Sequence, residues 1–166
     1  MAQRLFRFLS VFPGGLCLDG VEWVGDRIGL TADTLFTLHA LVEASLLGPA
    51  RTPSGTRYAQ LETMRTYGLD LLDACGERHA ASNVLADWSL HVSGQAEAGI
   101  RSGDEPWWDE RIRREMANMR AARSHLRNEQ RLDDLVALSA GLYEWSMLRD
   151  ASELWQWADD LGTLPL

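Results

Sequence analysis

The stretch Arg57-Tyr-Ala-Gln-Leu-Glu-Thr-Met-Arg-Thr-Tyr-Gly-Leu-Asp-Leu-Leu72 changes its hydrophobic period partway along. Its start has the two-residue period of a strand, and its continuation has apolar residues at three- and four-residue steps, as in a helix. The pattern therefore predicts a short strand that leads directly into an amphipathic helix. The buried face of that helix is expected to carry Leu61, Met64, Gly68, Leu71, Leu72 and Cys75.

A strand at this position needs a partner, and the nearest candidate is Ser45-Leu-Leu-Gly48. The connecting segment Pro49-Ala-Arg-Thr-Pro-Ser-Gly55 contains prolines and a glycine, which are typical of a hairpin tip. A hairpin with helices before it and a longer helix after it has the outline of a winged helix.

Three helices are expected before the hairpin. The first spans residues 4–12 and ends at a turn formed by Pro13-Gly14-Gly15, and the second is capped by Asp19 and breaks at Gly29. The first helix buries Leu5, Phe8, Leu9 and Phe12, and the second carries Val21, Trp23, Val24 and Ile28.

The third helix is expected to begin near Thr31 or Asp33. Its predicted core stripe is Leu35, Leu38, Val42 and Leu46, broadened by Phe36 and Leu41. The polar positions expected to face outward are Asp33, Thr34, Thr37, His39, Glu43 and Ser45, which include no arginine or lysine. A helix that reads the major groove needs basic or amide side chains on this face, so direct DNA binding is disfavoured.

The second half of the chain is predicted to be helical throughout. Ala74-Cys-Gly76 is expected to end the preceding helix. The chain is therefore predicted to consist of a winged helix, residues 1–77, and a truncated helical domain, residues 78–166. Amphipathic helices are expected at residues 79–100, 106–128, 132–148 and 151–161. Short loops between them favour antiparallel, tetratricopeptide-like pairs, and the last pair is expected to expose an apolar face suited to self-association.

Composition excludes several classes of protein. The chain has 166 residues, 16 basic and 24 acidic, and its net charge of −8 argues against a general nucleic-acid or membrane surface. All the basic residues are arginine, so neither a P-loop nor a Schiff-base lysine can be present. No apolar run is long enough to cross a bilayer. Cys17 and Cys75 are far apart and are expected to be small core residues in a reducing cytoplasm.

Two arginines and two composite patterns are candidates for binding. Arg51 and Arg57 in the hairpin could contact a nucleic-acid phosphate. The segment Asp104-Glu105-Pro106-Trp107-Trp108-Asp109-Glu110 could form a sugar platform, but it also fits a helix start with a cap, a proline and acids. The row Arg113, Arg120 and Arg127 could bind phosphate, but it is also expected to pair with Glu110 or Glu115.

Four segments together resemble the STAND-type bacterial ATPases and LuxR-type transcriptional regulators. They are Arg4-Leu-Phe-Arg-Phe-Leu-Ser-Val-Phe-Pro-Gly-Gly15, Leu38-His-Ala-Leu-Val-Glu-Ala-Ser-Leu-Leu47, Arg57-Tyr-Ala-Gln-Leu-Glu-Thr-Met-Arg-Thr-Tyr67 and Glu115-Met-Ala-Asn-Met-Arg-Ala-Ala122. In that family a P-loop ATPase module precedes a winged helix, and tetratricopeptide-like repeats follow. The resemblance therefore implies the part of such a regulator that follows the nucleotide-binding module.

The resemblance also implies where a nucleotide would be sensed. The family's histidine at the strand-to-helix step corresponds to Leu61-Glu62-Thr63, so Glu62 and, one turn on, Arg65 are the candidate nucleotide-side contacts. ATP or ADP would be bound by the missing module, and no cofactor is expected in this chain. In the family an acid usually precedes the asparagine, but here that position is Ala117. The resemblance therefore implies no role for Asn118 beyond local hydrogen bonding.

The sequence thus favours a mainly α, non-catalytic, cytoplasmic segment that couples sensing by helical repeats to a nucleotide switch. Its expected partners are other domains of a parent protein or a separate protein, with no membrane contact. The alternative is an independent winged-helix regulator that binds DNA through Arg51 and Arg57. An enzyme on the Trp107 and Trp108 platform would require a deep cleft with carboxylates of raised pKa.

Overall fold

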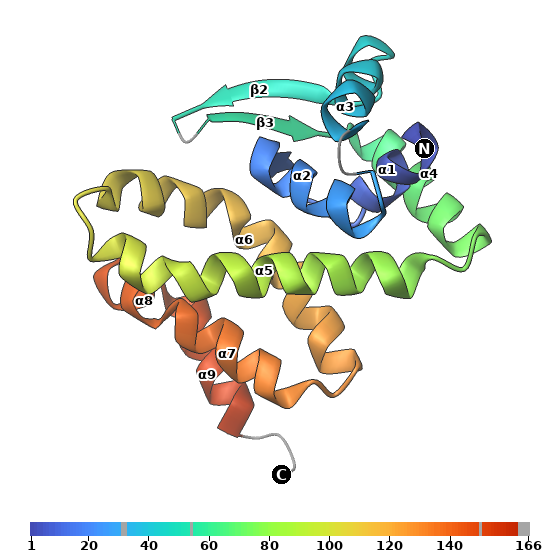
Figure 1. Ribbon diagram of the computed structural model, residues 1–166. Helices are drawn as coiled ribbons and strands as arrows, with labels where there is room; N and C mark the ends of the chain where they lie inside the picture. The colour runs from blue at the N-terminus through green and yellow to red at the C-terminus, as the bar shows by residue number, and fades with distance from the viewer. Residues whose placement is uncertain (31–32, 54, 150, 163–166) are drawn as a thin grey trace.

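The computed structural model describes residues 1–30, 33–53, 55–149 and 151–162, which form a mainly helical fold with a small antiparallel sheet (Figure 1). In Figure 1, α2 lies below the hairpin, α1, α3 and α4 lie at one end of it, and the long α5 runs beneath these helices. The helices are α1 (Ala2–Leu9), α2 (Leu18–Arg27), α3 (Thr34–Glu43), α4 (Glu62–Ala74), α5 (Arg78–Ile100), α6 (Glu105–Asn128), α7 (Leu132–Gly141), α8 (Tyr143–Arg149) and α9 (Ser152–Gly162).

The hairpin consists of β2 (Gly48–Thr52) and β3 (Gly55–Ala59), and a further short strand, β1 (Leu16–Cys17), pairs with β3. The strand order is β1-β3-β2, so β2 is an edge strand and tolerates Pro49. The partner strand predicted at residues 45–48 is therefore wrong, because the strand starts where that segment ends. Most of the expected hairpin tip is strand, and Ser54 within it lies outside the described residues.

The strand that leads into a helix is confirmed, since β3 ends at Ala59 and α4 begins at Glu62. Gly68 and Leu72 on the predicted face of α4 are buried. Leu61 and Cys75 are exposed instead, because they cap the two ends of the helix, beyond its packed middle. Cys75 is therefore not a core residue, whereas Cys17 is buried as expected.

The apolar residues expected for the first two helices are buried, except that Trp23 is only half-buried. Phe12 and Ile28 lie just beyond the helices, because α1 ends at Leu9 and α2 at Arg27 rather than where they were predicted to end. Asp19 does not cap α2, which begins one residue before it.

Helix α3 is rotated relative to the prediction. Thr34 and Thr37 are buried together with Leu38 and Leu41, whereas Leu35 is 53% exposed and Phe36 is 79% exposed. The four buried residues recur at three- and four-residue steps, so they form one helical face toward α1 and α2. The start at Thr31 lies outside the described residues.

The second half is built on α5, which packs along α6 and α7. The single helix predicted for residues 132–148 is two helices, α7 and α8, which meet at Leu142. A Cβ at Gly141 would lie 2.5 Å from the Ser93 carbonyl oxygen, so glycine lets α7 approach α5 closely just before the break.

One hydrophobic cluster runs through both halves of the fold, from Leu5 in α1 to Trp157 in α9. Among the helices of the described ranges, none combines the length and apolar character that crossing a bilayer requires.

Candidate functional site

Arg57 lies on β3 and is buried, with only 6% of its surface exposed. Its guanidinium donates hydrogen bonds to the carbonyl oxygens of Gly14 (2.6 Å), Gly15 (2.9 Å) and Arg114 (3.0 Å). It also forms an ion pair with Glu115, with 2.8 Å between Nη1 and Oε1. The expectation that Arg57 projects toward a nucleic-acid phosphate is therefore wrong, because its charge is neutralised inside the protein.

Glu115 and Asn118 on α6 extend this network. The second carboxylate oxygen of Glu115 accepts hydrogen bonds from Trp88 Nε1 (3.1 Å) and Asn118 Nδ2 (2.7 Å). Asn118 also accepts from the Gly14 N–H and donates to the Gly15 carbonyl, both at 2.9 Å. We call Arg57, Trp88, Glu115 and Asn118 the junction cluster, and all four side chains are buried.

The junction cluster holds the turn at residues 13–15, which was predicted from Pro13-Gly14-Gly15 and is confirmed. Gly15 has a φ of +66°, and a Cβ there would lie 2.4 Å from the Tyr58 carbonyl oxygen. Only glycine fits this backbone position without displacing the turn. The cluster therefore joins four segments that are distant in sequence: this turn, β3, α5 and α6.

The chemistry of the junction cluster is structural. The Cys17 thiol lies 3.7 Å from Arg57 Nη1. Burial raises the pKa of this thiol, and the lowering effect of Arg57 does not overcome it, so Cys17 is not activated as a nucleophile. A buried guanidinium and carboxylate that neutralise each other can fix geometry, but they present no reactive group to a substrate.

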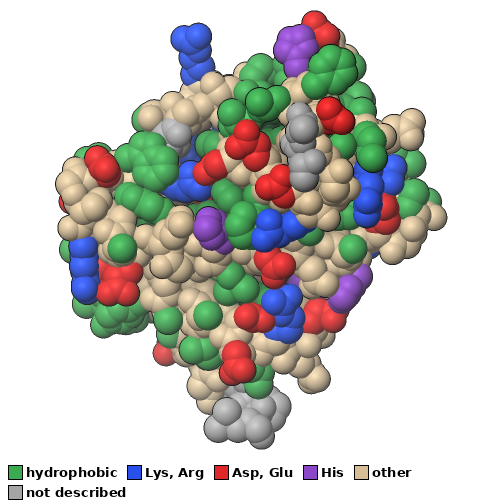
Figure 2. Space-filling view, viewed as in Figure 1, with side chains coloured by type: hydrophobic (Ala, Val, Ile, Leu, Met, Phe, Trp, Pro, Cys, Tyr) green, Lys and Arg blue, Asp and Glu red, His purple; other side chains and the backbone are tan. Residues whose placement is uncertain are grey.

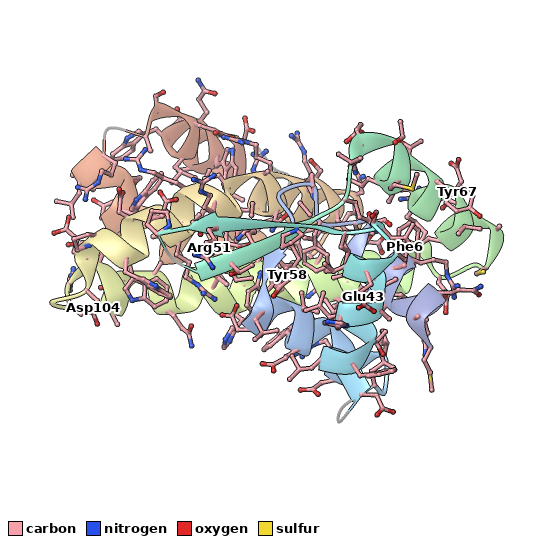
Figure 3. All side chains as sticks on the ribbon, turned by 90° about the horizontal axis from the view of Figure 1, so that it is seen from above. Phe6, Glu43, Arg51, Tyr58, Tyr67 and Asp104 are labelled. Carbon is pink, nitrogen blue, oxygen red and sulfur yellow. The ribbon has the colours of Figure 1, made fainter. Side chains whose placement is uncertain are left out.

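Arg51, the other arginine of the hairpin, is exposed on β2 and has no ion pair within the described part of the chain (Figure 3). Helix α3 contributes no arginine beside it, and Figure 2 shows arginines lying next to acidic side chains on this face rather than in a basic patch. Nucleic acid is bound through several phosphate contacts, and a single exposed arginine supplies only one of them.

Glu62 and Arg65 lie together in the first turn of α4. The Arg65 guanidinium donates to both carboxylate oxygens of Glu62, at 3.0 and 2.8 Å. These hydrogen bonds lower the pKa of Glu62 and keep the exposed pair ionised. The Arg65 guanidinium is thus already bonded to Glu62. The role of these two residues as nucleotide-side contacts stays a prediction.

The acidic, tryptophan-rich segment at the start of α6 binds other helices. Asp109 accepts hydrogen bonds from Trp145 (2.8 Å), Arg149 (2.8 Å) and Arg113 (3.0 Å). Burial raises the pKa of Asp109, but these three hydrogen bonds together lower it overall. A glycosidase acid needs a raised pKa, so Asp109 does not have the property that the sugar-platform interpretation requires.

The arginine row on α6 pairs with acids, but with none of the partners expected: Arg113, Arg120 and Arg127 pair with Asp109, Glu153 and Asp160. The pair of Arg120 with Glu153, in α9, has a distance of 2.6 Å. The two acids expected for this role are used elsewhere, since Glu110 pairs with Arg114 and Glu115 pairs with Arg57.

Apolar surfaces on the outside of the described fold include one over α3 and one at the helical end. The α3 surface surrounds a hollow of about 290 Å³ beside β2, and Figure 2 shows hydrophobic side chains gathered over α3. The helical-end surface surrounds a groove of about 400 Å³ between α7, α8 and α9. The α3 surface includes Leu18, Leu35, His39, Val42, Pro49 and Tyr58; the helical-end surface includes Val136, Ala140, Tyr143, Leu154, Trp155 and Leu161.

Glu115 is the junction-cluster residue whose burial the sequence could have revealed. It lies on the same face of α6 as Ile112, Met116 and Met119, all of which are buried. An acid within an apolar stripe requires a buried partner, and this requirement distinguishes Glu115 from the solvated acids around it.

Within the described ranges, no group of three or more histidine, cysteine, aspartate or glutamate residues is arranged to hold a metal ion. Comparison of the chain with protein-family models, with curated proteins and with solved structures gave no match. The function is therefore argued from the junction cluster and the surfaces around it.

Proposed function

We propose that this chain is a non-catalytic regulatory segment that couples binding at its helical second half to the position of its first half, as in a STAND-type ATPase regulator. In this proposal the first half is a winged helix and α5–α6 is the first tetratricopeptide-like pair. The junction cluster is the observation that carries the proposal. Its buried hydrogen bonds link the two halves, so that a displacement of one half can be transmitted to the other.

Three of the four junction-cluster residues, together with the turn that they hold, come from segments on which the family resemblance rests, whereas Trp88 does not. Gly14 and Gly15 belong to the first of those segments, Arg57 to the third, and Glu115 and Asn118 to the fourth. These segments are separated by up to 104 residues along the chain, yet they meet in a single hydrogen-bonded network. This convergence supports the resemblance, because it gives the shared residues one common physical task.

The helical-end surface is the proposed place for a protein partner. Val136 and Trp155 are exposed there, at 53% and 41%, and the groove between them has little polar lining. Exposed apolar patches of this kind mark interaction sites more often than solvated surface. ATP or ADP would be bound by a separate nucleotide-binding module, toward which Glu62 and Arg65 remain the proposed contacts.

The first test is genetic. A P-loop sequence encoded in frame before Met1, or in the adjacent gene, is expected. Genomic sequence without any P-loop module in that region would count against a STAND-type role.

The second test is biochemical. ATP turnover by that module is measured with the wild-type chain attached, with Glu115→Gln and with the control Glu110→Gln, whose ion pair is at the surface. Loosening the junction is expected to change turnover several-fold in Glu115→Gln only. Equal turnover in all three proteins would refute coupling through the junction cluster.

A mobility-shift assay distinguishes the DNA-binding alternative. If the chain acts only as a coupling segment, no DNA duplex should be retarded by it at physiological salt. Salt-sensitive binding that Arg51→Ala abolishes would instead establish a nucleic-acid site on the hairpin.

A further inference from the structure

A cleft of about 460 Å³ lies between the start of α2, the hairpin and the start of α6, next to the junction cluster but lined by none of its four residues. Tyr58, labelled on the hairpin in Figure 3, and Trp107 of α6 give it aromatic walls. Asp19 and Glu22 of α2 contribute carboxylates, and Arg111 of α6 contributes a guanidinium. The cleft thus combines both signs of charge with aromatic surface.

Arg111 differs sharply from Arg57 although the two are almost equally buried, at 7% and 6% exposure. All three nitrogens of the Arg57 guanidinium donate hydrogen bonds. Arg111 makes one ion-paired hydrogen bond, from Nη2 to Asp19 Oδ2 at 2.6 Å. Its Nε is buried and has no acceptor among the residues that the structure describes.

The tryptophans around Arg111 do not replace the missing acceptor. The Arg111 Cζ lies 5.5, 5.1 and 5.9 Å from the ring centroids of Trp88, Trp107 and Trp108. Aromatic rings at these distances stabilise a cation, but a guanidinium still has N–H donors that prefer oxygen acceptors such as carboxylates. A nearly buried guanidinium that lines a cleft and has a single carboxylate partner is therefore suited to accept a further oxygen acceptor from a ligand.

The charges of the cleft restrict what that ligand can be. Two carboxylates, Asp19 and Glu22, face one guanidinium, so a simple anion would meet a net negative cleft and be repelled. A ligand that carries an ammonium group beside its carboxylate satisfies both signs. An α-amino acid has this arrangement, with a side chain free to pack on an aromatic ring.

We propose that the cleft binds a free α-amino acid, with its carboxylate on Arg111, its ammonium group toward Asp19 and Glu22, and its side chain against Trp107. This binding does not depend on the coupling role proposed above, because it requires only the chain itself.

Isothermal titration of the whole chain with glutamate, arginine, leucine and phenylalanine tests the proposal, with acetate and methylammonium as probes of each half of the ligand. At least one amino acid is expected to bind saturably, and each half-probe at least about tenfold more weakly. Trp107→Ala and Glu22→Gln are each expected to weaken binding about tenfold or more. Asp26→Asn, which removes an exposed acid from the same helix, is the matched control and should leave affinity unchanged.

Three outcomes would overturn the proposal. The first is that none of the four amino acids binds saturably at concentrations up to about 10 mM. The second is acetate binding as tightly as any amino acid, which would show a simple anion site. The third is unaltered affinity in Glu22→Gln, an exposed position where the fold is not at risk, with far-UV circular dichroism confirming the native helix content.

Discussion

At the scale of single residues, Glu115 shows why a charge can be kept in a core. Glu115 is 2% exposed, and its carboxylate accepts hydrogen bonds from Arg57, Trp88 and Asn118. Taking a carboxylate out of water is costly, and only this degree of pairing compensates for it. The pair contributes little net stability compared with an apolar core, but removing one member leaves the other charge buried and alone.

Glu115→Ala is therefore expected to lower the free energy of unfolding by about 3–5 kcal/mol, because Arg57 loses its counter-charge. Glu110→Ala is the matched control on the same helix. It breaks an i,i+4 pair with Arg114 and should cost only about 0.3–0.5 kcal/mol. Urea denaturation of both variants measures the difference, and comparable losses would show that the junction cluster is no more important than a surface ion pair.

His125 gives the stability a dependence on pH near neutrality. Burial lowers the pKa of His125, with His79 and Arg131 acting in the same direction against Glu129. The folded pKa thus lies below the unfolded value of about 6.5, so the unfolded chain binds more protons. The stability that neutral His125 contributes is fully present above about pH 6.5. It is lost as the pH falls from there through the pKa of the folded state.

We therefore expect the free energy of unfolding to decrease from about pH 7.5 to about pH 5.5, a range in which exposed carboxylates remain ionised. In His125→Gln this decrease should be smaller. The measurement is urea denaturation across the range for both proteins. A slope that is the same in both would assign the pH dependence to other groups.

At the scale of elements, α3 shows how a helix can present its less polar side to solvent. Thr34 and Thr37 are buried, and Leu35 and Phe36 are exposed. Hydrophobicity alone predicts that the face with Leu35 and Phe36 is the buried one. The buried face is decided by packing, since Leu38 and Leu41 lie one turn from the two threonines on the side toward α1 and α2.

Substitutions to alanine distinguish the two faces of α3. Leu38→Ala is expected to cost about 2–5 kcal/mol, because Leu38 is 4% exposed and its removal leaves a cavity. Leu35→Ala should remain within about 0.5 kcal/mol, as for most surface substitutions. The check is the midpoint of urea denaturation, and a large loss in Leu35→Ala would show that α3 is turned the other way.

The elements that the sequence predicted well have a strong local signal. The period change at residues 57–72 gave β3 and α4, and Pro13-Gly14-Gly15 gave the turn. The elements that were missed depend on distant partners: β1 exists because β3 lies beside it, and the break at Leu142 follows the close approach of α7 to α5. The burial of Arg57 was missed for the same reason, since its partner Glu115 is 58 residues away.

At the scale of the whole molecule, the boundary predicted near Glu77 does not interrupt the core. A single hydrophobic cluster contains Leu5 and Val24 from the first half and Val92 and Leu138 from the second. The junction cluster adds buried hydrogen bonds across the same boundary. Two sequence regions with different patterns can therefore share one interior, and they should not unfold independently.

Equilibrium unfolding in urea is expected to be a single cooperative transition. Six of the seven tryptophans follow residue 80, so tryptophan fluorescence reports mainly on the second half, whereas far-UV circular dichroism reports on helices throughout. The two signals should give coincident transitions in the wild-type chain, as in a two-state protein. In Glu115→Ala the signals are expected to separate, because the variant loses the carboxylate that pairs with Arg57 across the two halves and leaves that guanidinium buried without its counter-charge. Separate transitions in the wild-type chain would mean that the junction cluster does not unite the two halves, and the proposed coupling would lose its physical basis.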